Sequence, residues 1–229
     1  MIFGGLQKVS LIDYPGKVSS VVFTQGCLFR CPFCHNPELI GQNQPGNITA
    51  EEILGYLNEH KNFLDGVCIT GGEPTIHKDL PEFINKINAL GLAVKLDTNG
   101  TNPEMVKLLL ANKSIDYLAM DLKNSWENYD LVANIGNQTA LANCQKTFSL
   151  IQNSGLAHEF RTTVFPAVHT EADFMAMVKN LQPGEKYFIQ NIRYLKTLDP
   201  KIDQTKTIDV PALVAKLQRA FPQVIIASR

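Results

Sequence analysis

The sequence predicts an α/β fold with a mostly parallel sheet. Short apolar segments rich in β-branched residues alternate about six times with amphipathic segments of helical period. Polar residues stand directly after three of the predicted strands, at 70–72, 97–100 and 121–123. Such alternation implies parallel strands joined by right-handed helical crossovers. An open doubly wound sheet and a barrel both fit, and in both the carboxyl ends of the strands form the functional rim.

Strand and helix signals alternate along the chain in order. Strands are predicted at 18–23, 66–70, 92–97, 115–121, 158–165 and 186–191, with a short seventh at 224–227. Helices are predicted after Thr49, Asp79, Asn102 and Thr170, four residues of types that cap helix N-termini. Two more helices are predicted over 141–151 and 212–221. Together these elements predict a single domain over residues 1–229, because no repeat or long polar linker interrupts them.

Helix signals in particular residues support these boundaries. Thr49 and Glu52 form the ends of a capping box, and Pro103 occupies a first helical position, where its missing N–H costs nothing. Gly91 and Gly155 stand where helices should end.

Composition narrows the class of protein. The chain has 229 residues, is 45% hydrophobic and 19% charged, and carries a formal net charge of −1. That balance gives no reason to expect a nucleic-acid or membrane partner. The N-terminus shows no signal-peptide pattern, and no apolar stretch approaches the roughly 20 residues of a membrane span. We therefore expect a cytoplasmic protein, and an odd number of cysteines, five, is a poor disulfide framework.

The decisive segment is a loop with three cysteines directly after the first predicted strand. Cys27, Cys31 and Cys34 have the spacing C-x3-C-x2-C, so their thiolates can converge on one metal centre. A structural zinc site would need a fourth ligand, and His35 is an awkward one because it adjoins Cys34. Three ligands for a four-iron cluster would instead leave one iron open, as in a reactive metal site.

The other two cysteines have different places. Cys68 falls in a predicted strand and Cys144 on the apolar face of a predicted helix. As small hydrophobic residues they are expected in the core.

A second motif strengthens the interpretation. Gly71-Gly72-Glu73-Pro74 follows the second predicted strand, and its glycines would let the backbone approach a ligand. Taken with the cysteine spacing, this GGEP segment resembles the radical S-adenosylmethionine superfamily. The resemblance implies one [4Fe–4S] cluster on the three cysteines, and S-adenosylmethionine bound to the open iron and to the GGEP segment. It further implies reductive cleavage of the sulfonium to methionine and a 5′-deoxyadenosyl radical, with the protein positioning that radical.

The closer resemblance is to the glycyl-radical-enzyme activases. Cys34-His35-Asn36 looks like their CHN signature, and the segments 97–100 (DTNG) and 121–123 (DLK) match two further motifs of the pyruvate formate-lyase activating enzyme. The resemblance implies that Asp97, Thr98 and Asp121 help form a monovalent cation site beside the cofactor carboxylate.

Two basic residues are also implied in cofactor binding. Lys123 would contact the cofactor carboxylate, and Arg161 matches an arginine near the cofactor. Asp121 and Lys123 share strand parity, so a structural ion pair is an equally natural interpretation, as is a salt bridge for Arg161. Gln190 is a weak match for a residue on the adenine side.

Residues 10–16 (SLIDYPG), followed by the run 25–36, most resemble the activating proteins of anaerobic ribonucleoside-triphosphate reductases. This implies a partial (β/α)6 barrel, TIM-like and of the radical SAM type, whose lateral opening admits a glycine-bearing loop. The expected partners are the glycyl-radical protein and a flavodoxin- or ferredoxin-like electron donor. The alternatives are an activase of another glycyl-radical enzyme, a small-molecule enzyme such as 7-carboxy-7-deazaguanine synthase, and a non-catalytic iron–sulfur or zinc module.

Overall fold

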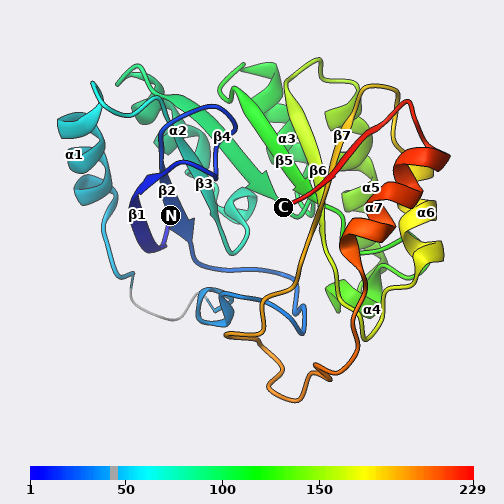
Figure 1. Cartoon of the computed structure of the whole chain (residues 1–229). Coiled ribbons are helices and arrows are strands. Elements are labelled where there is room, and N and C mark those ends of the chain that lie inside the picture. The colour runs from blue at the N-terminus through cyan, green and yellow to red at the C-terminus, as the bar shows by residue number, and fades with distance from the viewer. Residues whose placement is uncertain (42–45) are drawn as a thin grey trace. The chain divides into compact units, whose positions relative to one another are not determined.

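The computed structural model describes residues 1–41 and 46–229 (Figure 1). The chain forms two compact units, each of which is described by itself. Unit 1 comprises Met1–Leu28, Glu38–Ala119 and Asn143–Ala157, and unit 2 comprises Phe29–Pro37, Met120–Ala142 and His158–Arg229. The single domain expected over 1–229 stays a prediction.

In unit 1 the strands follow one another in chain order. They are β1 (Phe3–Ser10), β2 (Ser19–Thr24), β3 (Gly66–Gly71) and β4 (Ala93–Thr98). β1 pairs antiparallel with β2, whereas β2, β3 and β4 pair in parallel. The parallel strands are connected by α1 (Ala50–His60) and α2 (Leu80–Asn88), and α3 (Pro103–Ala111) follows β4. This strand–helix–strand order is the one that the sequence predicts.

Local sequence explains where the helices of unit 1 begin. The amide of Glu52 donates to the Thr49 hydroxyl at 3.2 Å, and the Glu52 carboxylate accepts a hydrogen bond from the Thr49 amide. These two hydrogen bonds form the predicted capping box. At the start of α3, the side chain of Asn102 precedes Pro103 and caps the helix by accepting a hydrogen bond from the amide of Met105. Asp79 precedes α2 as predicted, but its side chain makes no cap hydrogen bond and pairs instead with the amino group of Met1.

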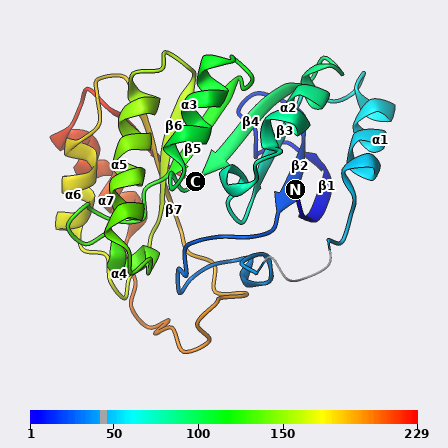
Figure 2. The ribbon, with the colours of Figure 1, turned by 180° about the vertical axis from the view of Figure 1, so that it is seen from behind.

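In unit 2 the strands β6 (His158–Thr163), β7 (Lys186–Gln190) and β8 (Ile225–Ser228) are parallel and also in chain order. Helix α6 (Glu171–Lys179) connects β6 to β7, and α7 (Val210–Ala220) connects β7 to β8. These two helices lie side by side in both views of the ribbon (Figures 1 and 2).

Unit 2 also contains the short helix α4 (Asp130–Ala133). Strand β5 (Tyr117–Asp121) and helix α5 (Gln138–Gln152) contribute residues to both units.

The sequence pattern misses β1 and α4. In β1 Phe3 and Ser10 are buried while the residues between them are half-buried or exposed, so the strand has no alternating apolar signal. α4 has four residues, too few for a helical period. The short last strand, predicted at 224–227, is confirmed as β8.

The apolar faces of these elements form the cores. Unit 1 buries Val22, Ile53, Ile69, Ile84 and Leu96 completely, and unit 2 does the same with Phe160, Phe174, Tyr187, Ile189 and Leu217. Cys68 and Cys144 are buried, as predicted for core cysteines. Within residues 1–41 and 46–229, no helix combines the length and the apolar character that a membrane crossing needs.

Candidate functional site

The loop that carries Cys27 is held by backbone hydrogen bonds within unit 1. The amide of Gly26 donates to the Leu39 carbonyl at 2.7 Å, and the amide of Cys27 donates to the Ile40 carbonyl at 3.1 Å. Cys27 itself is partly exposed at the end of this fixed loop. The backbone around the first predicted cluster ligand is therefore well defined by its partners.

The GGEP segment, residues 71–74, is joined directly to the Cys27 loop. The amide of Glu73 donates to the Gly26 carbonyl at 2.7 Å, and the amide of Gly72 donates to the Thr24 carbonyl at 2.9 Å. A Cβ on Gly72 would lie 2.2 Å from the Gly26 carbonyl oxygen, and Gly71 has φ of +108°. Only glycine meets both demands. The sequence suggests that these glycines let the backbone approach a ligand. In the structure the backbone at Gly72 closely approaches the loop that carries Cys27.

Glu73 is a buried acid whose oxygens are used inside unit 1. Its Oε1 accepts hydrogen bonds from the hydroxyls of Thr75 at 2.5 Å and Thr98 at 2.7 Å, and its Oε2 accepts one from the Asn99 amide at 2.6 Å. Burial raises the pKa of this carboxyl, and the donated hydrogen bonds oppose the rise. Glu73 thus links the GGEP segment to the DTNG segment.

Glu73→Gln should lower the free energy of unfolding by about 1–3 kcal/mol, because an amide NH2 would face donors and leave buried polar groups unpaired. Because the pKa of Glu73 is raised, its contribution is greatest below the ordinary carboxyl pKa of about 4.3 and falls as pH rises through the folded-state pKa. The variant should lose that dependence. Urea unfolding at several pH values measures both effects, with Glu82→Gln on the surface of α2 as the control. Unchanged stability would contradict the network.

Asp97 is paired with a buried lysine. The Nζ of Lys95 lies 2.5 Å from Asp97 Oδ1 and 3.7 Å from the Sγ of Cys68, and the lysine side chain is 1% exposed. β3 and β4 place Cys68 opposite Lys95 in register. In the described structure, the cation beside Asp97 is thus the ammonium group of Lys95. The resemblance had implied a monovalent metal cation beside Asp97. Lys95 was not singled out from the sequence, although a charged residue inside an apolar strand was a usable signal.

Asn99 contacts the first predicted cluster ligand, Cys27, and the sequence analysis gave Asn99 no role. Its Nδ2 donates to the Sγ of Cys27 at 3.6 Å, and its Oδ1 accepts from the amide and hydroxyl of Thr101 at 3.0 and 2.8 Å. Thr98 faces Glu73 rather than open space. In unit 1, hydrogen bonds therefore connect Cys27, the GGEP segment and the DTNG segment.

Unit 2 holds the other two predicted ligands. The amide of Cys34 donates to the Cys31 carbonyl at 3.0 Å, which makes a tight turn. The Pro32 carbonyl accepts from the amide of Asp199 at 2.9 Å, and the ring of Phe33 packs against Phe165 with centroids 5.3 Å apart. Aromatic packing and backbone contacts thus fix this part of the cysteine loop.

Asp121, Lys123 and Arg161 form a charged cluster in unit 2. Lys123 Nζ lies 2.9 Å from Asp121 Oδ2, and Arg161 binds Asp121 Oδ1 through both Nε and a terminal nitrogen at 2.9 Å. Burial alone would raise the pKa of Asp121, but the two cations hold it well below its usual range. The ion pairs therefore stabilise the fold above about pH 3.9, and this contribution is lost as pH falls below that value.

Two further residues of unit 2 bear on the resemblance. His35 accepts a hydrogen bond from the amide of Arg193 at 3.3 Å. Burial lowers the pKa of His35, and the charges of Arg193 and Lys123 lower it further. Gln190, at the end of β7, is half-buried, and its backbone carbonyl accepts a hydrogen bond from the amide of Val164.

The structure therefore connects the predicted site residues in two sets, one in each unit. Within the described ranges 1–41 and 46–229, no three His, Cys, Asp or Glu side chains are gathered as a metal site. The donor chemistry fits an iron–sulfur cluster, because cysteine thiolates bind soft metals and an amide N–H, that of Asn99, points at the sulfur of Cys27.

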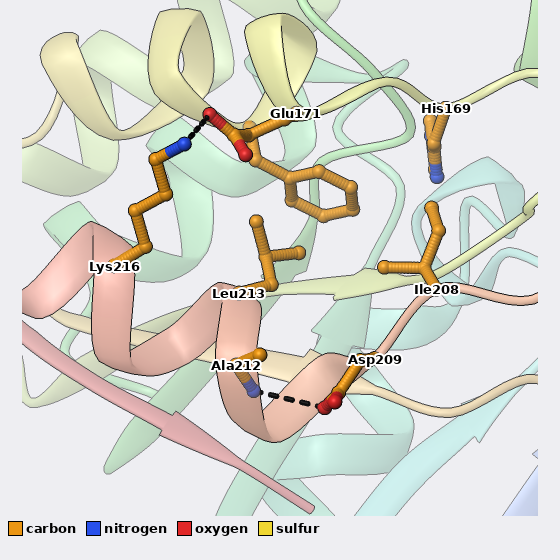
Figure 3. Close-up of a pocket in the computed structure, with 8 residues that line it drawn as sticks. His169, Glu171, Ile208, Asp209, Ala212, Leu213 and Lys216 are labelled. Atoms are coloured by element: carbon orange, nitrogen blue, oxygen red, sulfur yellow. Dashed lines mark hydrogen bonds and ion pairs between the residues drawn. The ribbon is translucent and has the colours of Figure 1, made fainter.

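A cavity of about 330 Å³ lies between α6 and α7 (Figure 3), and its lining residues include none of the predicted site residues. Its charged groups have partners in the protein: Glu171 pairs with Lys216 at 2.5 Å, and Asp209 accepts from the Ala212 amide at 2.9 Å. His169, on its wall, is engaged on both ring nitrogens, with the Phe165 amide and the Lys123 carbonyl. We do not assign the active site to this cavity.

The chain resembles known proteins both in sequence and in structure. The family model described as the radical SAM superfamily matches residues 21–181. A protein of Methanocaldococcus jannaschii, provisionally assigned as a glycyl-radical enzyme activating enzyme, is 36% identical over 192 residues, which cover 82% of this chain and 79% of the relative. The pyruvate formate-lyase-activating enzyme of Listeria monocytogenes is 32% identical over 128 residues, which cover 52% of this chain and 51% of the relative.

Among solved structures, Streptococcus suis SuiB bound to S-adenosylmethionine superposes with a TM-score of 0.71 and 16% identity. The match covers 91% of this chain and 49% of SuiB, so the chain spans about half the length of that protein. At this identity the likeness shows the fold alone, and it confirms an α/β fold of the radical SAM type, the expected partial barrel. With the matches in sequence, it shows that the chain is a radical SAM enzyme and belongs to the family of glycyl-radical-enzyme activating enzymes.

Proposed function

We propose that this chain is a cytoplasmic enzyme that installs a glycyl radical in an anaerobic ribonucleoside-triphosphate reductase. The observation that carries the proposal is the run of residues 25–36, with the cysteine spacing C-x3-C-x2-C and the CHN signature, in a chain that belongs to the activase family. Residues 10–16, which resemble those of the reductase activating proteins, support this partner.

In this proposal Cys27, Cys31 and Cys34 hold one [4Fe–4S] cluster. When bound, the cluster supplies an electron, received from a flavodoxin- or ferredoxin-like protein, to cleave S-adenosylmethionine so that a hydrogen atom can be taken from a glycine Cα. The protein residues bind and orient. Lys123 and Arg161 supply positive charge for the cofactor carboxylate, and Asp121 holds both side chains in place through its two ion pairs.

The residues of unit 1 have supporting roles. Gly71, Gly72, Glu73 and Pro74 form one wall of the proposed cofactor site, and Glu73 fixes that wall to Thr98 and Asn99. Asp97 faces the Lys95 ammonium, so a monovalent metal cation at Asp97 is not part of the proposal.

Lys123→Ala should weaken binding of S-adenosylmethionine about 10-fold or more, since a charge-assisted hydrogen bond to its carboxylate is lost. Iron content should not change. Isothermal titration calorimetry on anoxically loaded protein measures the affinity, and Lys146→Ala is the control because that lysine is 55% exposed and pairs with Glu104 on the surface. Unaltered affinity would make Lys123 a purely structural partner of Asp121.

The partner is tested with purified glycyl-radical proteins. The anoxically loaded, reduced enzyme is mixed with S-adenosylmethionine and either anaerobic ribonucleotide reductase or pyruvate formate-lyase, the partner suggested by the name of the Listeria relative. The proposal predicts the glycyl doublet in electron paramagnetic resonance with the reductase. A doublet with pyruvate formate-lyase alone would assign the other partner. Release of 5′-deoxyadenosine without a doublet in either mixture would favour a small-molecule substrate.

A further inference from the structure

We propose that Asn99 is a positioning residue that raises the reduction potential of the cluster through its hydrogen bond to Cys27. The inference rests on the proposed function, because it needs the cluster on Cys27. It concerns a side chain to which the sequence analysis gave no role. All the contacts that carry it lie within unit 1.

The amide of Asn99 has a fixed direction. Its Oδ1 accepts two hydrogen bonds from Thr101, from the backbone amide at 3.0 Å and from the hydroxyl at 2.8 Å. An NH2 group could not accept either bond, so the oxygen must face Thr101. The Nδ2 therefore faces the Sγ of Cys27, at 3.6 Å.

The backbone of Asn99 is held as firmly as its side chain. Its amide donates to Glu73 Oε2 at 2.6 Å, and its carbonyl accepts from the Sγ of Cys144 at 3.4 Å. The next carbonyl, that of Gly100, accepts from the Thr147 hydroxyl at 2.7 Å. Asn99 is 6% exposed, so water does not compete for these groups. The N–H group is thus preorganised toward the sulfur before any metal binds.

The direction of the effect follows from electrostatics. An N–H dipole pointing at a ligating sulfur stabilises negative charge there, and the reduced cluster carries one more negative charge than the oxidised one. The hydrogen bond therefore favours the reduced state and makes reduction by a one-electron donor of the flavodoxin or ferredoxin class easier. Interactions of this outer shell commonly tune a metal centre in proteins.

The test uses two substitutions of Asn99 and one matched control. Asn99→Ala removes the N–H donor, and Asn99→Asp keeps the oxygen that accepts from Thr101 but places a carboxylate oxygen against the sulfur. Thr101→Val is the control, because it removes one contact to Asn99 Oδ1 while the backbone amide of residue 101 and the N–H···S bond remain. Each protein is loaded anoxically without S-adenosylmethionine and titrated with mediators, and the reduced cluster is followed by electron paramagnetic resonance.

We expect the potential to fall in Asn99→Ala and further in Asn99→Asp, and to stay at the wild-type value in Thr101→Val. Wild-type potentials in both Asn99 variants would overturn the inference while leaving the cluster assignment intact. A shift in Thr101→Val as large as that in Asn99→Ala would also overturn it, because loop packing would then set the potential. A wild-type protein that binds no iron would overturn the proposed function itself, and the inference with it.

Discussion

Replacing Cys31 by alanine is expected to abolish cluster assembly and the formation of 5′-deoxyadenosine. Two thiolates cannot hold a cluster that already has one iron without a protein ligand, so each remaining ligand is needed. Cys31 is buried in the turn closed by the Cys34 amide, and no other cysteine lies near it in sequence except the two other proposed ligands. Iron analysis and chromatography of the reaction products after anoxic loading measure both effects.

The two core cysteines provide matched controls. Cys68 and Cys144 are 1% and 0% exposed and stand on β3 and α5. Cys68→Ala and Cys144→Ala should retain the iron content of the wild type, with a modest loss of stability from the removed buried sulfur. Persistent turnover in Cys31→Ala, or loss of iron in the controls to the same degree, would overturn the assignment of the ligands.

Lys95→Met is expected to lower the free energy of unfolding by about 3–5 kcal/mol. The substitution keeps the length of the side chain but leaves the Asp97 carboxylate, 12% exposed, without the ammonium at 2.5 Å. Removing the charged partner of a carboxylate at a poorly hydrated position is among the more damaging single changes in a protein. Urea unfolding of the anoxic protein measures the loss, with the exposed Lys146→Met as the control.

A double variant separates charge from packing. Lys95→Met combined with Asp97→Asn removes both charges and should recover much of the lost stability, since the two effects are coupled. Added potassium should stabilise Lys95→Met more than the wild type if a metal cation can take the place of the ammonium. A Lys95→Met protein as stable as the wild type would show that the ion pair has no net value.

Elements with strong local signals could be predicted from the sequence. Thr49 and Thr170 begin helices through capping boxes, and Gly91 and Gly155 take positive φ after helices, as their residue types suggest. The ion pair between Asp121 and Lys123, one of the two interpretations that the sequence left open for these residues, is present and joins residues two positions apart in the chain. Signals of this kind depend on neighbours in the chain.

Other features depend on contacts between distant segments. The sequence shows that Glu73 follows two glycines, but its inward direction depends on donors 25 and 26 residues away, in Thr98 and Asn99. Lys95 reads as a strand residue, and its burial beside Cys68 is set by the register of β3 and β4. β1 has no periodic pattern because its middle residues are not buried. Tertiary structure was needed for each of these.

The yield of 5′-deoxyadenosine from the wild-type chain is the most direct test of the cluster proposed on Cys27, Cys31 and Cys34. The protein is loaded with iron and sulfide under strictly anoxic conditions, its metal content is determined, and it is reduced and mixed with S-adenosylmethionine. A four-iron cluster and 5′-deoxyadenosine that depends on reductant are expected. Zinc without iron, or a fully loaded and reduced cluster that releases no 5′-deoxyadenosine, would contradict this expectation.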